Sequence, residues 1–193
     1  MNKEISIICL GSWNNKVYTP NMVANKVFNL PIGANMGINI NQNTFDCSFV
    51  NDTIVFSPFN NSLQFRCTQN PSMDEAKKMN DFFLSSMKLQ PWAPLTAFGY
   101  NITLNMSAEE FSASPLSGAF PSVGVGRFNP SKIEYRSKDG NGTHKLIISN
   151  ENGNYTVNYN LENTKLSDEV IEKGLFSILN DDVINIMGEQ YGL

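Results

Sequence analysis

The sequence predicts an α+β protein in which helices cover one face of an antiparallel sheet. Two groups of short segments alternate apolar and polar residues with period two, the first from Thr44 and the second from Ser131. Asn-rich turns separate the segments, and helical patterns from Ser72 and Ser167 follow the two groups. At 193 residues, the chain is expected to form a single domain, residues 1–193, with a substantial apolar core.

A strand and a short helix are predicted at the start of the chain. Residues 5–10 form a nearly unbroken apolar run, which predicts a buried strand in the middle of the sheet. Thr19 and Pro20 match the N-cap and the first position of a helix, and apolar residues recur at helical spacing through Phe28. We therefore expect a helix of about two to three turns.

A first meander and a long helix are predicted next. The alternation between Phe45 and Cys67 predicts three antiparallel strands with one polar face. Ser72 and Glu75 match a capping box, in which each side chain binds the backbone N–H of the other residue. The helix that begins there must end before Pro91, because proline cannot donate the next backbone hydrogen bond.

The same order of elements recurs in the second half of the sequence. Its elements are an alternating strand over residues 98–104, a capping box at Ser107 and Glu110, a meander over residues 133–159 and the helical pattern from Ser167. Measured from Ile5 to Thr96, from Thr44 to Ser131 and from Ser72 to Ser167, the offsets between equivalent elements are 91, 87 and 95 residues, which predicts internal duplication with halves 1–92 and 93–193. Chance recurrence of a common arrangement is the alternative. Runs at 38–40 and 123–128 predict one further strand in each half.

The sheet face away from the helices is predicted to be open and polar. Its side chains are mostly neutral hydrogen-bonding groups, as expected for the wet face of an antiparallel sheet. They form a candidate interaction face made of Asp46, Ser48, Gln64, Arg66, Asn101, Thr103, Glu134, Arg136, Thr156 and Asn158.

Few residues suit catalysis or metal binding. The single histidine, His144, excludes sites built from several histidines, and its place after a hairpin turn predicts an exposed side chain. Cys9, Cys47 and Cys67 fall at inward-facing positions, which predicts structural thiols and argues against a Cys–His dyad. We expect no catalytic residue, cofactor or metal site.

Adjacent carboxylates occur at four places, and each place is a predicted helix start. Negative charge is favourable there because of the helix dipole, so capping explains the pairs without an acid–base or cation site. The pairs are Asp74-Glu75, Glu109-Glu110, Asp168-Glu169 and Asp181-Asp182.

The charge and hydropathy of the chain limit its partners. A net charge of −4 argues against nucleic acid and anionic lipid, which require concentrated Lys and Arg. No apolar run approaches the roughly 20 residues that span a bilayer, and the apolar run at residues 5–10 is too short for the core of a signal peptide. A cytoplasmic protein of bacterial or phage origin is expected.

Two segments resemble a known family. Residues 95–102, Leu-Thr-Ala-Phe-Gly-Tyr-Asn-Ile, are similar to an Arg-x-Gly-x-x-Tyr-x-x-Arg-Ile strand, and residues 174–183 are similar to a closing helical segment. These two patterns occur in a sporadically distributed family of uncharacterised bacterial proteins, which are built as two strand-meander-helix halves. At fold level, the duplication also resembles the TATA-binding protein. The resemblance implies an architecture and no site, and the acidic charge argues against DNA binding.

Three functional hypotheses follow. The first is a non-enzymatic interaction or assembly module that binds a protein partner or a second copy of itself through the polar face or an unpaired sheet edge. The second is a small-ligand-binding protein, and the third is an unidentified enzyme that uses carboxylates or tyrosines. The cavity of the second hypothesis would lie between helices and sheet, lined by Met79, Phe83, Met87, Phe98 and Tyr100.

Overall fold

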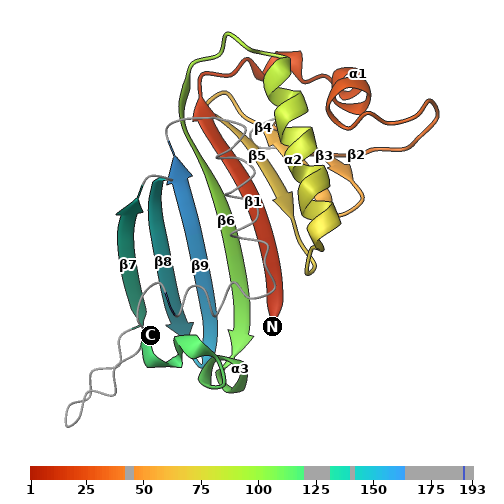
Figure 1. Cartoon of the computed structure of the whole chain (residues 1–193). Helices are drawn as coiled ribbons and strands as arrows, with labels where there is room; N and C mark the ends of the chain where they lie inside the picture. Colours follow the sequence, from red (N-terminus) through yellow and green to blue (C-terminus); the bar gives the residue numbers. More distant parts are fainter. Residues whose placement is uncertain (42–45, 120–130, 140–141, 164–188, 190–193) are drawn as a thin grey trace.

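In the part of the chain that the structure describes, the main element is a nine-stranded antiparallel sheet (Figure 1). The computed structural model describes residues 1–41, 46–119, 131–139, 142–163 and 189. The strand order is β2-β3-β4-β5-β1-β6-β9-β8-β7. The strands are β1 (Asn2–Gly11), β2 (Gly37–Ile40), β3 (Cys47–Asn51), β4 (Ile54–Pro58), β5 (Ser62–Cys67), β6 (Leu95–Ser107), β7 (Lys132–Asp139), β8 (Gly142–Glu151) and β9 (Asn154–Asn163). The helical segments are η1 (Asn15–Val17), α1 (Pro20–Met22), η2 (Val23–Val27), α2 (Met73–Lys88), α3 (Ala108–Ser112) and η3 (Pro115–Ala119). The α+β fold with an antiparallel sheet is therefore confirmed.

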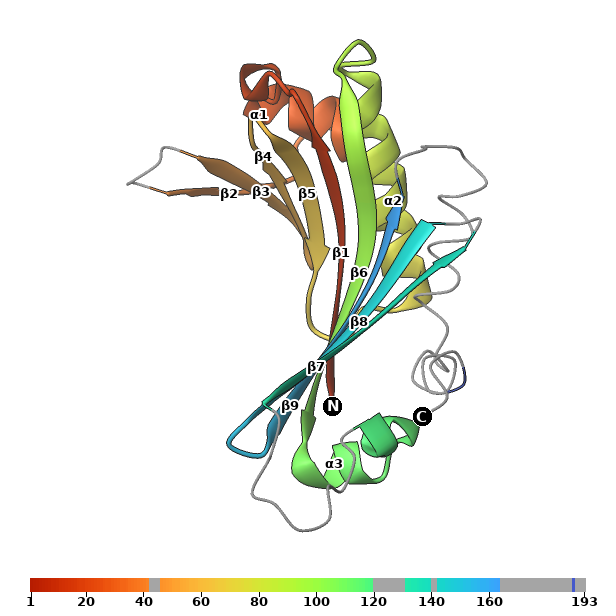
Figure 2. The same cartoon turned by 90° about the vertical axis from the view of Figure 1, so that its left-hand side faces the viewer.

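The long helix α2 lies on one side of the sheet (Figure 2). It begins at the predicted capping box: the Ser72 Oγ accepts the Glu75 N–H at 3.2 Å, and the Glu75 carboxylate accepts the Ser72 N–H at 2.8 Å. Its inward residues Ala76, Met79 and Phe83 are buried. α2 contacts the sheet at β5 and β1, so it lies over the strands that precede it in the chain.

A row of phenylalanines crosses the strands β3, β4 and β5 beneath α2. Phe49, Phe56 and Phe65 are cross-strand partners on β3, β4 and β5, and all three are buried. The ring centroids of Phe56 and Phe65 are 4.3 Å apart, and those of Phe49 and Phe56 are 6.2 Å apart. Phe83 of α2 meets this row edge-on at Phe65. These contacts join the helix to the outer strands of the sheet.

The first strand lies at the centre of the sheet, as predicted. β1 pairs with β5 on one side and with β6 on the other. Ile5, Ile7 and Cys9 are buried on the α2 side, whereas Ile8 is half-buried and Leu10 is 45% exposed on the opposite side. The expectation that the strand is fully buried was therefore wrong for one face, where no described helix packs on β1.

The shorter predicted elements are also present. The helix at Thr19 begins as α1 and continues as the π-helical turn η2, and the second capping box, at Ser107, starts α3. The predicted run at 38–40 forms β2. The run at 123–128 and the helix from Ser167 lie outside the described residues. Within the described part of the chain, no helix has the length and apolar character needed to cross a membrane.

Candidate interaction surface

The sheet face opposite α2, here called the open face, carries the predicted interaction residues. All of them except Asp46 lie on strands, and the strand registers place them on this one face. For example, Ser6 pairs with both Arg66 and Asn101, and Thr103 pairs with Asn158. Asp46 is half-buried and lies just before β3. In Figure 2 the open face lies on the side of β1 and β6 away from α2.

Side chains on the open face between β6 and β9 bind one another. The Asn160 amide donates to the Asn101 carbonyl oxygen at 2.6 Å, and the Asn158 amide donates to the Thr103 hydroxyl at 3.0 Å. The Thr156 hydroxyl donates to Asn105 at 3.2 Å. Asn105 and Asn160 were not among the predicted residues, although the alternation of polar residues on β6 and β9 could have identified them. This ladder already satisfies much of the hydrogen-bonding capacity of the polar face.

Two shallow hollows flank Ile8 at the centre of the open face. One, of about 170 Å³, lies over β4, β5 and β1 and is lined partly by Ser57 and Arg66. The other, of about 160 Å³, lies over β1, β6 and β9 beside Gly99 and Asn160. Both are smaller than the roughly 300–1,000 Å³ that is typical of small-molecule sites. They are therefore shallow depressions in the open face, and their size does not favour the binding of a small ligand.

The residues predicted to line a ligand cavity lie on the opposite side of the sheet. Met79, Phe83, Phe98 and Tyr100 are buried, and Met87 is half-buried, with its sulfur 3.8 Å from that of Cys9. Burial raises the pKa of the Cys9 thiol to about 12, so this thiol stays protonated. The cavity itself stays a prediction.

A second surface is the outer edge of β2, here called the β2 edge. β2 is the last strand on its side of the described sheet and pairs only with β3. All four of its residues are exposed, with Ile38 at 44% and Ile40 at 60%. Ile38 pairs with Phe49 and Ile40 with Cys47, so both isoleucines extend the sheet face of the phenylalanine row. In Figure 2, β2 and β3 extend away from the rest of the sheet.

The sequence around the β2 edge contains no charge. Between Lys26 and Asp46 there is no Asp, Glu, Lys or Arg, and no proline lies within β2. The hypothesis of an unpaired edge did not name these residues. A search for short alternating apolar segments within long uncharged stretches could have found them, although residues 89–108, which include β6, also match that pattern.

His144 is buried, contrary to the prediction that it is exposed. Its side chain is only 7% exposed, and its Nδ1 lies 2.5 Å from the Tyr159 hydroxyl. The reason is alternation along β8: His144 shares its face with Leu146 and Ile148, which are both buried. The strands β6 and β9 separate His144 from Cys9, so the two residues lie at least roughly 14 Å apart and form no dyad.

The surroundings of the cysteines and of the described acidic pairs fit a structural role. Cys9 and Cys67 are buried and Cys47 is half-buried, and all three are free thiols. Hydrogen bonds from the Ser72 backbone N–H and the Thr53 hydroxyl hold the pKa of Glu75 below its usual value. Asp168-Glu169 and Asp181-Asp182 lie outside the described residues. In the described ranges, no group of three or more His, Cys, Asp or Glu side chains is arranged to hold a metal ion.

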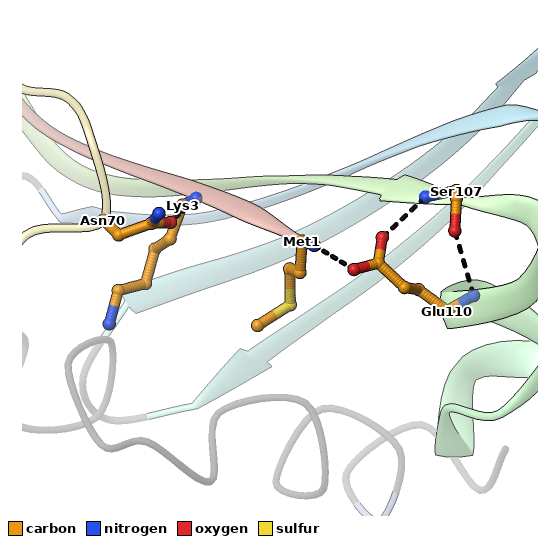
Figure 3. Close-up of polar contacts among 5 residues, drawn as sticks. All are labelled: Met1, Lys3, Asn70, Ser107 and Glu110. Carbon is orange, nitrogen blue, oxygen red and sulfur yellow. Dashed lines mark hydrogen bonds and ion pairs between the residues drawn. The ribbon is translucent and has the colours of Figure 1, made fainter.

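The second capping box also binds the N-terminus (Figure 3). The Ser107 Oγ accepts the Glu110 N–H at 3.2 Å, and the Glu110 carboxylate accepts the Ser107 N–H at 2.8 Å. The same carboxylate pairs with the Met1 ammonium group, which is the main cause of the lowered pKa of Glu110. Beside it, the Lys3 N–H donates to the Asn70 side chain at 2.6 Å. These contacts fix the start of β1.

Comparisons with known proteins give little information about this site. No protein-family model matches the chain, and no curated protein matches it. Among solved structures, a similar chain is the Trypanosoma brucei AdoMetDC-delta26 monomer, with 10% sequence identity and a TM-score of 0.35. The match covers 86% of this chain and 66% of that one, so about a third of that protein has no counterpart here. Similarity this weak carries no argument, and the resemblance to the two-half bacterial family stays a prediction.

Proposed function

We propose that the protein is a non-enzymatic interaction or assembly module whose principal binding surface is the β2 edge. The observation that carries the proposal is the exposed, uncharged strand of β2 with Ile38 and Ile40 on one face. An edge strand offers unpaired N–H and C=O groups to another chain. Proteins usually protect such edges with charge or proline, so an edge without either is suited to binding.

The open face provides a second, weaker contact surface in this proposal. Its exposed Arg66 and Leu10 lie beside the two hollows, while the Asn and Thr ladder at β6 and β9 is already hydrogen-bonded. A partner on this face would have to replace hydrogen bonds that the chain makes internally, which lowers the net gain. The β2 edge requires no such exchange between protein groups.

The experiment compares capture of partners by three forms of the full chain. Wild-type, Ile40→Lys and Ile32→Lys proteins are used as baits in lysate of the native cell, and light scattering after gel filtration reports self-association. Ile32 is a matched control because it is fully exposed and lies outside β2. We expect wild type and Ile32→Lys to bind the same partner, or a second copy, and Ile40→Lys to lose at least roughly tenfold of that binding.

Two results would contradict the proposal. A wild-type protein that stays monomeric and captures nothing has no assembly role. Equal binding by Ile40→Lys and wild type would instead move the interaction away from the β2 edge. Circular dichroism of each variant confirms that the fold is kept.

We also infer that the fold arose by internal duplication. In both halves the first strand pairs with the last strand of the following meander, β1 with β5 and β6 with β9, and the two first strands pair with each other. This arrangement supports a pseudo-two-fold axis between β1 and β6. An experimental structure tests it: β1, β3, β4 and β5 should superpose on β6, β7, β8 and β9 in that order, and a different order would contradict duplication.

The three free thiols support a reducing compartment such as the cytoplasm.

A further inference from the structure

We propose that the partner of the β2 edge is the β2 edge of a second copy, joined antiparallel about a two-fold axis at Asn39. The inference rests on the proposed function and names its partner. In this pairing Ile38 of each copy lies opposite Ile40 of the other copy, and the two sheets become one continuous sheet. The proposal depends on the direction of the backbone groups, on the symmetry of the sequence and on charge.

The backbone groups of Ile38 and Ile40 face outward. The Asn41 N–H donates to the Asp46 carbonyl at 2.9 Å, so residue 41 points its backbone groups toward β3. In an antiparallel pair, residues two apart point the same way and intervening residues point the other way. Asn39 therefore also faces β3, while Ile38 and Ile40 present their N–H and C=O groups at the free edge.

The sequence Ile38-Asn39-Ile40 reads the same in both directions. A two-fold axis at Asn39 therefore pairs isoleucine with isoleucine at both outward-facing positions, and each pair can exchange both of its backbone hydrogen bonds. A shift by two residues in either direction leaves one isoleucine of each copy without an isoleucine partner. The symmetric register is thus the one that uses the edge fully.

Charge favours this contact between two acidic chains. Each copy carries a net charge of −4, so two copies repel one another over most of their surfaces. The stretch from residue 27 to residue 45 contains no charged residue, and β2 lies within it. Two copies that meet at β2 bring no like charges together in the paired strands.

Side chains on the two faces differ in their contribution. The four isoleucines of the pair lie on the sheet face of Phe49, where they continue the apolar row across the two-fold axis. On the other face, Asn39 of one copy lies opposite Asn39 of the other in a pair without backbone hydrogen bonds, where Cα atoms approach to about 4.5 Å. Because β2 has only four residues, we expect a small interface and a reversible, concentration-dependent dimer.

Sedimentation equilibrium of the full chain at concentrations up to about 1 mM tests the pairing. We expect wild type and Ile32→Lys to dimerise, and Ile40→Pro to weaken the dimer at least roughly tenfold. Proline at position 40 removes a donor that faces outward, so the pairing of β2 with β3 stays intact. Ile40→Lys is the second variant, in case proline disturbs the hairpin. A monomer at all concentrations, or a dimer unaffected by both variants, would overturn the proposal.

Cysteine cross-linking tests the register. Asn39→Cys and, as a control, Asn41→Cys are made in a Cys47→Ser background and oxidised with copper phenanthroline, which takes up the two electrons as two thiols lose their protons and join. In the proposed register the Asn39→Cys thiols meet within disulfide distance, whereas two cysteines at position 41 are about 13 Å apart along the strands. We expect covalent dimer to form at least roughly tenfold faster for Asn39→Cys. Equal or faster cross-linking by Asn41→Cys would refute this register.

Failure of this inference is distinguishable from failure of the proposed function. If the chain is monomeric but captures another protein in an Ile40-dependent way, self-pairing is wrong and the interaction module stands. If neither self-association nor Ile40-dependent capture occurs, both the self-pairing and the proposed interaction module are wrong.

Discussion

The two edges of the sheet are built in opposite ways. β7 has eight residues, and five of them are charged: Lys132, Glu134, Arg136, Lys138 and Asp139. β2 has four residues, none of them charged, with exposed isoleucines. Charge on an edge strand discourages pairing with other chains, because pairing would bury or oppose those charges. Under the proposed function, the charged edge of the described sheet is protected against association, and the uncharged edge is the one that binds.

The packing behind the two edges also differs. β2 lies against β3, whose Phe49 belongs to the phenylalanine row. β7 lies against β8, where Ile148 and the buried pair of His144 and Tyr159 fill the interior. The β2 edge is therefore attached through neighbouring phenylalanines, and the β7 edge through Tyr135, aliphatic side chains and the contact of His144 with Tyr159.

The largest effect is expected from Phe49→Ala. Removing this buried ring should lower the free energy of unfolding by about 3–5 kcal/mol and speed hydrogen exchange in β2, because the ring supports the hairpin. Urea denaturation and exchange measured by mass spectrometry check both effects. The control Ile148→Ala should also destabilise the protein but leave exchange in β2 unchanged. Unchanged exchange in Phe49→Ala would contradict the aromatic attachment.

A smaller effect is expected from Tyr159→Phe, behind the other edge. The substitution removes the hydroxyl that contacts His144 in the interior, and we expect a loss of about 1–2 kcal/mol in urea denaturation. Tyr100→Phe is the control, since its hydroxyl makes a long hydrogen bond of 3.4 Å to Asn80 and should cost less. A larger loss in the control would argue against a structural role for the His144 contact.

Removing charge from β7 should weaken its protection. In an Ile40→Pro background, Arg136→Thr together with Lys138→Thr should cause new self-association, because the edge loses two exposed cations. The folded stability should change little, since the pair of Arg136 and Glu134 is exposed and exposed ion pairs contribute little to folding. Sedimentation velocity compares the variant with its background. Identical sedimentation of the two would show that charge is not what protects β7.

The smallest expected effect is a change in the stability of the folded protein at acidic pH. The pKa of Glu75 is lowered in the folded state, so its contribution to stability is complete above the unfolded value of about 4.3 and is lost as pH falls through the folded pKa. Wild type should lose stability in this range, and Glu75→Gln should lose less. Residues 27–45 contain no acidic or basic side chain, and the carboxylates elsewhere stay ionised above about pH 6, so dimerisation should not change between about pH 6 and 8. A dimer that dissociates within that interval would indicate a charged interface elsewhere.

Local signals explain which features were predictable from the sequence. The capping boxes at Ser72 and Ser107 and the period-two alternation act over a few residues, so they identify helix starts and the polar face. The burial of His144 could also have been predicted, since it lies at every-second-residue spacing with Leu146 and Ile148, but the preceding turn favoured an exposed side chain. The order β5-β1-β6-β9 depends on pairing between distant strands, for which one sequence carries no direct signal. The exposure of β2 depends on which strand ends the sheet, and it was missed for the same reason.

The central position of β1 has a consequence for biosynthesis. The strand leaves the ribosome before its partner β6, which begins at Leu95 and follows some 90 residues later. At about 5–20 residues per second, the apolar run of β1 waits roughly 5–20 s for that partner. During this interval β5 can cover only one side of the strand. Translation speed and early chaperone contact should therefore influence the yield of this protein more than they would for a fold that pairs neighbouring strands in order.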